Sequence, residues 1–173
     1  MSMPRAVCAT TKSSTSITSE RQLKRLPDLL AAWAVALWVG GLWAIGYLAA
    51  PALFYNLEDR MLAGFVAGRM FAWMAWVGIV CGAWLLVFRI SRAGAGVVKQ
   101  AFFWIVVAMV LLTIAQHFGI RPLLQELKDQ AMPKDVMESL FRDRFQTWHG
   151  VSSAVYLVQS LLGLALVAKQ HGK

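Results

Sequence analysis

Two of the three histidines, His117 and His149, are the residues best suited to chemistry by type and position. Each lies at one end of a long apolar stretch, and the two stretches are neighbours along the chain. If both stretches form helices that pack antiparallel, the two imidazoles lie at the same end of the hairpin. Paired imidazoles can bind haem iron, form part of a metal site or relay a proton. The other interpretation is that each histidine keeps its polar edge hydrated at a helix end.

Met70 and Met74 are four residues apart, which places both thioethers on one face of a helix. Thioether and imidazole ligands together suit Cu(I), so the candidate metal ligands are His117, His149, Met70 and Met74. Methionine is also a common filler of irregular gaps in apolar cores. The main hypothesis therefore includes no cofactor, and haem or copper belongs to an alternative, redox interpretation. No acid, base and nucleophile are arranged as in an enzyme, and we name no catalytic residue.

The composition indicates that these residues are carried by membrane helices. Hydrophobic residues make up 58% of the chain and charged residues 15%, and the mean hydropathy is +0.56. A soluble domain has about 25% charged residues. About 20 helical residues cross the hydrocarbon layer. Four apolar segments reach that length, and they predict an all-α bundle of four transmembrane helices at about residues 29–51, 69–89, 100–120 and 149–168.

The remaining segments are polar. Residues 1–26 are basic and rich in Ser and Thr, and we expect them to form a tail without order. Residues 27–168 form the membrane domain, and residues 169–173 are a short basic end. Two amphipathic pieces, at about residues 123–131 and 137–148, separate the third and fourth spans. Asp135 and Glu138 resemble a capping box at the start of the second piece. We expect both pieces to lie on the membrane surface.

The basic charge lies on one side of the predicted bundle. Both chain ends and the loop between the second and third spans share a side, which holds ten of the 17 Lys and Arg and two of the nine Asp and Glu. The opposite side holds seven of each. By the positive-inside rule both termini are cytoplasmic. We expect a bacterial inner-membrane protein, and the net charge of +8 then reflects topology rather than binding to nucleic acid.

Small residues recur at every fourth position in two spans, namely Ala32, Ala36, Gly40 and Ala44 in the first and Gly78 and Gly82 in the second. Such lines of small residues let helices approach closely in lipid, so we predict that both are helix-packing surfaces. Pro51 has no N–H and its ring clashes with the preceding turn. We predict that it kinks or ends the first helix.

No charged residue lies near the middle of a span, which argues against an ion-coupled transporter because such proteins keep a charged partner there. Uncharged polar residues do occur inside the spans: Gln116, Ser152, Ser153, Gln159 and Ser160. We expect them to form hydrogen bonds between helices, each worth about 0.6 kcal/mol. The sharper alternative is that they line a polar cavity.

The two halves of the chain share a short repeated sequence pattern. Pro51-x-Leu53 followed by Arg69-x-x-x-Trp73 parallels Pro122-x-Leu124 followed by Arg144-x-x-x-Trp148. A duplicated helical hairpin would place a pseudo-two-fold axis along the membrane normal.

The sequence resembles the bacterial membrane family described as domain of unknown function 4149, which is related to transmembrane protein 205-like proteins. The resemblance is carried by Leu37-Trp38-Val39-Gly40-Gly41, by Ala50-Pro51-Ala52-Leu53-Phe54, by Leu62-Ala63-Gly64 with Ala67-Gly68-Arg69-Met70-Phe71, and by Phe145-x-x-Trp148-His149-Gly150-Val151-Ser152. It covers about residues 28–168. It implies a four-span membrane protein without an established activity, and it supplies no catalytic residues.

Together these observations predict a non-enzymatic multi-pass membrane protein. Its expected roles are helix packing and assembly, or the handling of a small solute or a metal. Its expected partners are the lipid bilayer and, within it, a second copy or other membrane proteins. The alternative is a haem- or metal-binding redox protein that uses His117 and His149.

Overall fold

The structure, a computed structural model, describes residues 11–130 and 138–171. Every regular element in these ranges is helical: α1 (Thr11–Trp43), η1 (Ala44–Ala49), α2 (Ala50–Asn56), α3 (Arg60–Ala93), η2 (Gly94–Lys99), α4 (Ala101–Ile114), η3 (Ala115–Ile120), α5 (Arg121–Gln130) and α6 (Glu138–His171). The predicted all-α fold class is confirmed.

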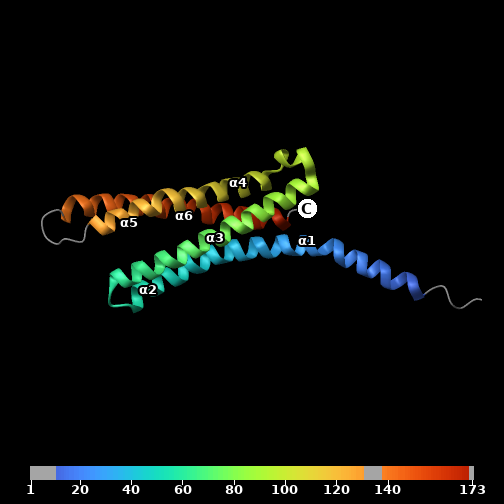
Figure 1. Cartoon of the computed structure of the whole chain (residues 1–173), viewed down its shortest axis with the longest axis horizontal. Helices are drawn as coiled ribbons and strands as arrows, with labels where there is room; N and C mark the ends of the chain where they lie inside the picture. Colours follow the sequence, from blue (N-terminus) through green and yellow to red (C-terminus); the bar gives the residue numbers. More distant parts are fainter. Residues whose placement is uncertain (1–10, 131–137, 172–173) are drawn as a thin grey trace, which may run out of the picture.

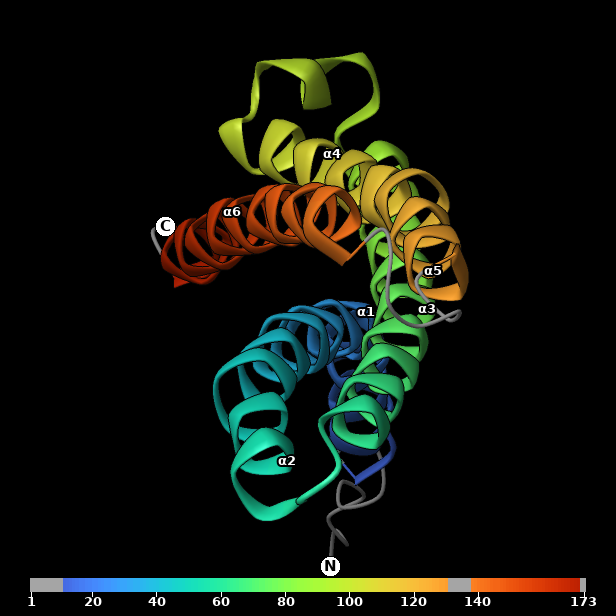
Figure 2. The same ribbon diagram turned by 90° about the vertical axis from the view of Figure 1, so that its left-hand side faces the viewer.

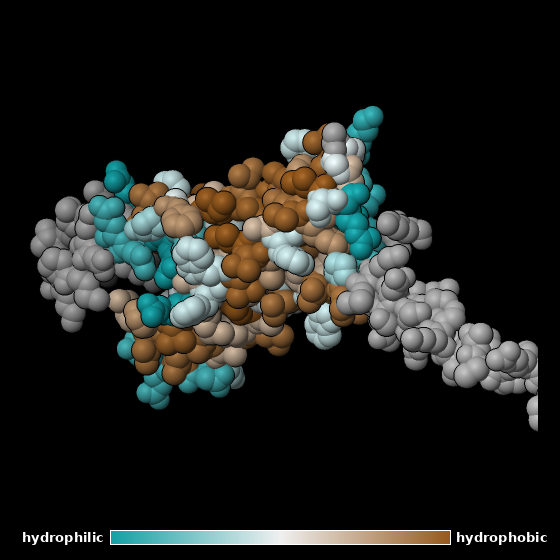
Figure 3. Space-filling model, turned by 45° about the vertical axis from the view of Figure 1, so that its right-hand side comes forward, coloured by the Kyte–Doolittle hydropathy of each residue, from teal (hydrophilic) through white to brown (hydrophobic). Residues whose placement is uncertain are grey.

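Four helical segments are long and apolar enough to cross a membrane: Arg25–Asn56, Arg60–Ala93, Ala101–Glu126 and Gln146–Gln170. They cover the four predicted spans except for residue 100, and they extend beyond most of them. In Figure 3, brown apolar side chains cover the middle of the visible face, and teal hydrophilic ones gather toward both ends. This banding fits a bundle surrounded by lipid at its middle and by water at its ends.

The helices run side by side along one long axis (Figure 1). The start of α1, the α3–α4 connection through η2 and the end of α6 lie at one end, which we call the terminal end. Elements α2 and α5 lie at the other, which we call the α2–α5 end. Within the described residues, α1 therefore begins and α6 finishes at the same end of the bundle, as an even number of spans requires.

Each long helix packs against two others. Figure 2, seen along the bundle, shows α3 beside α1 and α4, and α6 beside α4. Helix α1 also contacts α6, which completes the ring. The core is apolar and includes Val35, Trp38, Leu42, Leu85, Val106, Met109 and Leu166. Outward side chains are apolar as well, for example Trp33 and Leu48 at 72% exposure each, because the surface around a span faces lipid.

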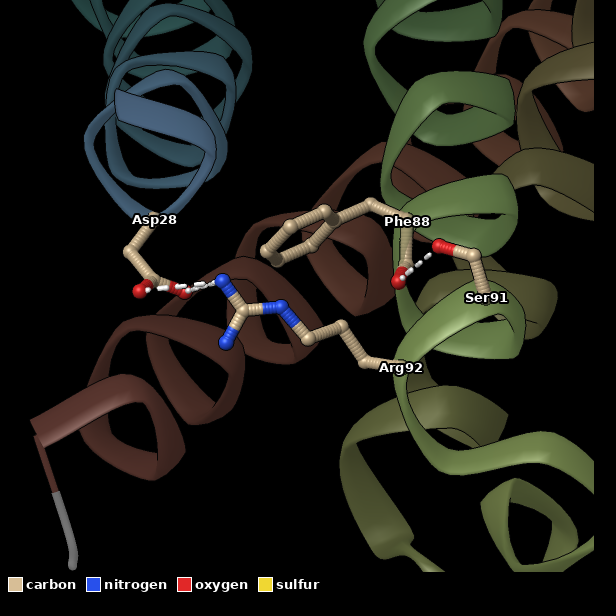
Figure 4. Close-up of polar contacts among 4 residues, drawn as sticks. All are labelled: Asp28, Phe88, Ser91 and Arg92. Atoms are coloured by element: carbon tan, nitrogen blue, oxygen red, sulfur yellow. Dashed lines mark hydrogen bonds and ion pairs between the residues drawn. The ribbon is translucent and has the colours of Figure 1, made fainter. Parts of the chain in front are cut away.

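Local signals set several helix ends. The Asp59 carboxylate accepts hydrogen bonds from the backbone N–H groups of Met61 at 2.8 Å and Leu62 at 3.2 Å, and so caps the start of α3. Gly94 ends α3 with φ 53°, a conformation that a side chain would strain. At the terminal end, Arg92 of α3 forms an ion pair with Asp28 of α1 at 3.2 Å (Figure 4).

The polar tail differs from the expectation. Helix α1 begins at Thr11, so the described part of residues 1–26 is helical rather than without order. Residues 1–10 lie outside the described residues. Gln22, Leu23, Lys24 and Arg25 are all good helix formers, and they adjoin a helix that is already nucleated by the span. Extending that helix needs no separate nucleus.

The amphipathic pieces also differ from the expectation. They do not form separate surface helices, because α5 continues the axis of α4 through η3, and the second piece is the first part of α6 (Figure 1). Helix α5 packs against α6. Asp135 of the proposed capping box lies outside the described residues.

Two segments of π-helix interrupt the long helices, and each stands just before a proline. Segment η1 ends at Ala49, before Pro51, and η3 ends at Ile120, before Pro122. In each case the residue next to the proline donates its N–H five residues back, Ala50 to Ile45 and Arg121 to Gln116. The helix continues through Pro51 to Asn56. Pro51 therefore does not end the helix but follows a widened turn.

Candidate functional site

The His117 ring lies in η3 and is flanked by two aromatic rings. The ring of Trp76, from α3, meets it edge to face with 5.6 Å between centroids, and Phe118 does so at 4.8 Å. The Nδ1 atom of His117 is buried and has no hydrogen-bond partner in the described part of the chain. Trp76 and Phe118 are 50% and 59% exposed. The imidazole therefore sits between α3 and η3, next to the lipid-facing surface.

Gln116, which precedes His117, points to another helix. Its Nε2 donates a hydrogen bond to the Ser152 carbonyl of α6 at 2.8 Å. Gln116 therefore faces α6, while the next residue, His117, faces α3 through its contact with Trp76. The hydrogen bond to Ser152 fixes the rotation of η3 between its two neighbours.

His149 lies on α6 with an exposed side chain, and its carbonyl accepts a hydrogen bond from the Ser153 hydroxyl at 2.9 Å. The ring contacts of His117 are made with Trp76 and Phe118. The predicted pairing of His117 with His149 stays a prediction.

Met74 packs on the other side of α3. It is buried in the core, and a Cβ added to Gly41 of α1 would lie 2.6 Å from its Sδ. Met74 and Trp76 are two residues apart, which is about 200° around a helix. Met74 thus faces α1 whereas Trp76 faces His117. Met70 is half-buried one turn before Met74.

Met74 and His117 thus have different neighbours, since Met74 lies against Gly41 of α1 and His117 against Trp76 of α3. Among residues 11–130 and 138–171, no three His, Cys, Asp or Glu side chains gather closely enough to hold a metal ion. Haem or copper binding stays a prediction.

Tyr156 of α6 packs into the first π segment. Its hydroxyl donates to the Leu42 carbonyl, and its ring occupies the space that a side chain at Gly46 would need. Phe71 of α3 meets the Tyr156 ring edge on, with 5.3 Å between centroids. Each π segment is therefore contacted by an aromatic ring from the opposite half of the chain, η1 by Tyr156 and η3 by Trp76.

A polar contact joins α4 and α6 near the middle of their spans. The buried Gln159 amide donates to Thr113 Oγ1 at 2.6 Å, and the Thr113 hydroxyl donates to the Met109 carbonyl at 2.8 Å. The predicted hydrogen bonding between helices is confirmed for Gln116 and Gln159. Ser160 is also buried, and its hydroxyl has no partner among the residues that the structure describes.

The fully buried Trp38 indole packs against Gly78 and Gly82. A Cβ on Gly78 would overlap the Trp38 indole, and one on Gly82 would lie 3.1 Å from Trp38 Cη2 and would overlap Val110. These two small residues therefore allow α3 to pack closely against both α1 and α4. Their spacing had pointed to helix packing.

The small residues of α1 are placed differently. Ala36, Gly40 and Ala44 are exposed, Ala32 is half-buried, and a Cβ on Gly40 would meet no described atom within 4 Å. Within this chain the line does not serve as the packing surface of the bundle. It lies open on the lipid-facing side of α1.

Three residues of these sites were not singled out from the sequence: Trp76, Phe118 and Tyr156. Of these, only Tyr156 could have been found from the sequence, because the hydroxyl side chains of Ser152, Tyr156 and Ser160 recur every four residues on one face of α6. The assembled groups offer hydrogen bonds, aromatic faces and one imidazole. They suit packing and the binding of uncharged molecules better than acid–base catalysis, which needs positioned proton donors and acceptors.

Comparison with models of known protein families matches residues 33–133 to a domain of unknown function, DUF4149. The matched range runs from within the first span to just past the end of the third, and it agrees with the resemblance carried by residues 37–71. No curated protein and no solved structure matches the chain.

Proposed function

This chain belongs to the DUF4149 family of domains of unknown function, and we propose that it is a non-enzymatic membrane protein that assembles laterally with a second copy of itself. The observation that carries the proposal is the open line of small residues on α1. Ala36, Gly40 and Ala44 are exposed at four-residue spacing, and no described atom fills the space beside Gly40.

A lipid-facing line of this kind favours association for a physical reason. Lipid tails are as apolar as leucine, so helices associate through close van der Waals packing rather than through the hydrophobic effect. Small residues permit that close packing. The chain itself supplies an example, because Gly78 and Gly82 admit Trp38 to the interface of α1 with α3. The line on α1 offers a similar surface that nothing in the described part of the chain fills.

The position of the line suits a symmetric dimer. Gly40 lies near the middle of the span Arg25–Asn56, so two copies of α1 would cross near the bilayer centre. A two-fold axis along the membrane normal then brings each small residue close to its own copy. Such a dimer is parallel, so both copies keep the same orientation in the membrane.

The oligomeric state in bilayers tests this proposal. Donor- and acceptor-labelled copies should show energy transfer that saturates with protein density. Gly40→Leu should weaken association at least tenfold, or about 1.4 kcal/mol. Val80→Leu is the matched control, because Val80 is 66% exposed on α3 and away from the line. Energy transfer that is unchanged by Gly40→Leu would refute the proposed interface.

We propose further that both termini are cytoplasmic and that the membrane is the bacterial inner membrane. The support is the charge distribution, with the whole net charge of +8 on the side of the termini. A reporter that is active only after export should be active when it is fused after Gln130. A reporter that is active only in the cytoplasm should be active when it is fused after Lys173. The opposite pattern would invert the orientation.

The alternative roles predict different measurements. Haem or copper binding through His117 would give a visible absorption band or bound metal in the purified protein. A role in moving a small solute would make the polar groups Gln159 and Ser160 necessary for flux into vesicles. A colourless, metal-free protein without flux leaves lateral assembly as the function supported here.

A further inference from the structure

We propose that His117, Trp76 and Phe118 form a site, open to the lipid, for the ring of a quinone dissolved in the membrane. The site lies between α3 and η3, and it uses none of the small residues of α1. The inference therefore does not depend on lateral assembly.

The first observation is the unsatisfied imidazole. Nδ1 of His117 is buried and has no hydrogen-bond partner among the described residues. A buried polar group without a partner is uncommon and costs stability. A ligand with a hydrogen-bonding oxygen would satisfy the imidazole, which can donate from whichever nitrogen carries its proton.

The second observation is the aromatic surround. Trp76 and Phe118 stand edge on to His117, and their own centroids are 6.2 Å apart. Each ring remains about half exposed to the lipid. A planar conjugated ring that arrives from the bilayer can therefore pack against two aromatic side chains while it reaches the imidazole. Aromatic rings favour such stacked or edge-on neighbours.

The third observation is the depth and rigidity of the site. His117 lies toward the α2–α5 end of the span Ala101–Glu126, one turn before Arg121. The hydrogen bond from Gln116 to Ser152 holds η3 against α6 and leaves His117 turned toward α3. A quinone has a polar ring and an apolar tail. At this depth the ring lies near the polar boundary while the tail stays in the hydrocarbon.

A quinone suits these groups better than a metal or an ion. At this site the His117 imidazole meets the rings of Trp76 and Phe118, and within the described residues no three His, Cys, Asp or Glu side chains gather closely enough to hold a metal ion. Metal sites are built from several such ligands. A neutral ring with two carbonyl oxygens needs only one hydrogen bond and a flat apolar surround.

The full chain in lipid nanodiscs, titrated with a decyl-substituted benzoquinone, tests the proposal. We expect saturable quenching of tryptophan fluorescence. The infrared band of one quinone carbonyl should move to lower frequency, because that carbonyl accepts a hydrogen bond. His117→Phe keeps an aromatic ring and removes both nitrogens, so it should weaken binding about tenfold and abolish the carbonyl shift.

Two further variants separate the site from general effects. His117→Gln retains a side-chain N–H donor and should keep part of the carbonyl shift, which serves as the test if His117→Phe does not fold. Trp104→Phe is the matched control, because Trp104 is 57% exposed near the terminal end and its Nε1 donates to the Val98 carbonyl. It should leave the quinone affinity unchanged. Quenching that does not saturate, or that is equal in His117→Phe and wild type, shows partition into the lipid only and overturns the proposal. A haem absorption band lost in His117→Phe would also overturn it.

Discussion

Pro51 and Pro122 occupy equivalent places in the two halves of the chain, each two residues after a six-residue π-helical segment. A proline has no N–H and its ring collides with the carbonyl one turn back. Widening the preceding turn relieves both problems without breaking the helix. The sequence pattern repeated between residues 51–73 and 122–148 thus has a structural counterpart, although the spacing of its matched positions is unequal.

Replacing Pro51 restores a backbone donor, so Pro51→Ala should convert η1 toward regular α-helix. The amides of residues 46–50 should then exchange with deuterium more slowly than in the wild type, as measured in nanodiscs. Pro122→Ala should slow exchange in residues 117–121 in the same way. Unchanged exchange in both segments would show that the prolines do not cause the π-helix.

Gly78→Ala should destabilise the protein by about 1–3 kcal/mol, because the added methyl overlaps the Trp38 indole inside a packed core. The matched control is Gly68→Ala, also on α3, where a Cβ meets no described atom within 4 Å. Unfolding in mixed detergent measures both. The double variant Gly78→Ala with Trp38→Leu should lose less than the sum of its single changes, and strict additivity would count against direct contact.

Tyr156→Phe removes the hydroxyl that donates to the Leu42 carbonyl and keeps the ring that fills the space at Gly46. We expect a loss of about 0.6 kcal/mol, with about 1.7 kcal/mol near the upper limit for such bonds in membrane proteins. Tyr156→Ala should destabilise the protein more, because it also removes the ring that contacts Phe71. Equal losses in the two variants would assign the whole effect to the hydroxyl and contradict the packing role of the ring.

The ion pair between Arg92 and Asp28 should contribute little. The two side chains are 50% and 57% exposed, and exposed pairs are worth about 0–1 kcal/mol. Arg92→Gln should therefore change the free energy of unfolding by less than about 0.5 kcal/mol, a difference that shrinks at high salt. A loss of several kcal/mol would show that this contact holds α1 and α3 together.

The spans were predictable because an uninterrupted apolar run of sufficient length is typical of a membrane helix. The rotation of each helix was not. In a membrane helix the lipid-facing side is as apolar as the side that faces the bundle, so periodicity does not mark the inner face. The spacing of Ala36, Gly40 and Ala44 predicts a helix-packing surface but not which neighbour it meets, and the structure turns Val35, Trp38 and Leu42 inward instead.

The candidate site was predictable only in part. His117 stood out by residue type, but its neighbour depends on the rotation of η3, which the Gln116–Ser152 hydrogen bond and the π-helix set together. The sequence suggested His149 across the hairpin as a partner and did not point to the contact that His117 makes with Trp76 of α3. Helix continuity was also missed, since polar composition at residues 11–25 and 121–130 indicates water but does not end a helix.

Disulfide cross-linking along α1 in membranes tests lateral assembly most directly. With Cys8→Ser and Cys81→Ala as the background, single cysteines introduced by Ala36→Cys, Gly40→Cys and Ala44→Cys can bridge two copies only where the Cα atoms approach within about 4.4–6.8 Å. The proposed assembly predicts oxidised dimers at these positions and none for Val80→Cys, on the lipid-facing side of α3. Equal cross-linking at Val80→Cys, or none at the three α1 positions, would contradict it.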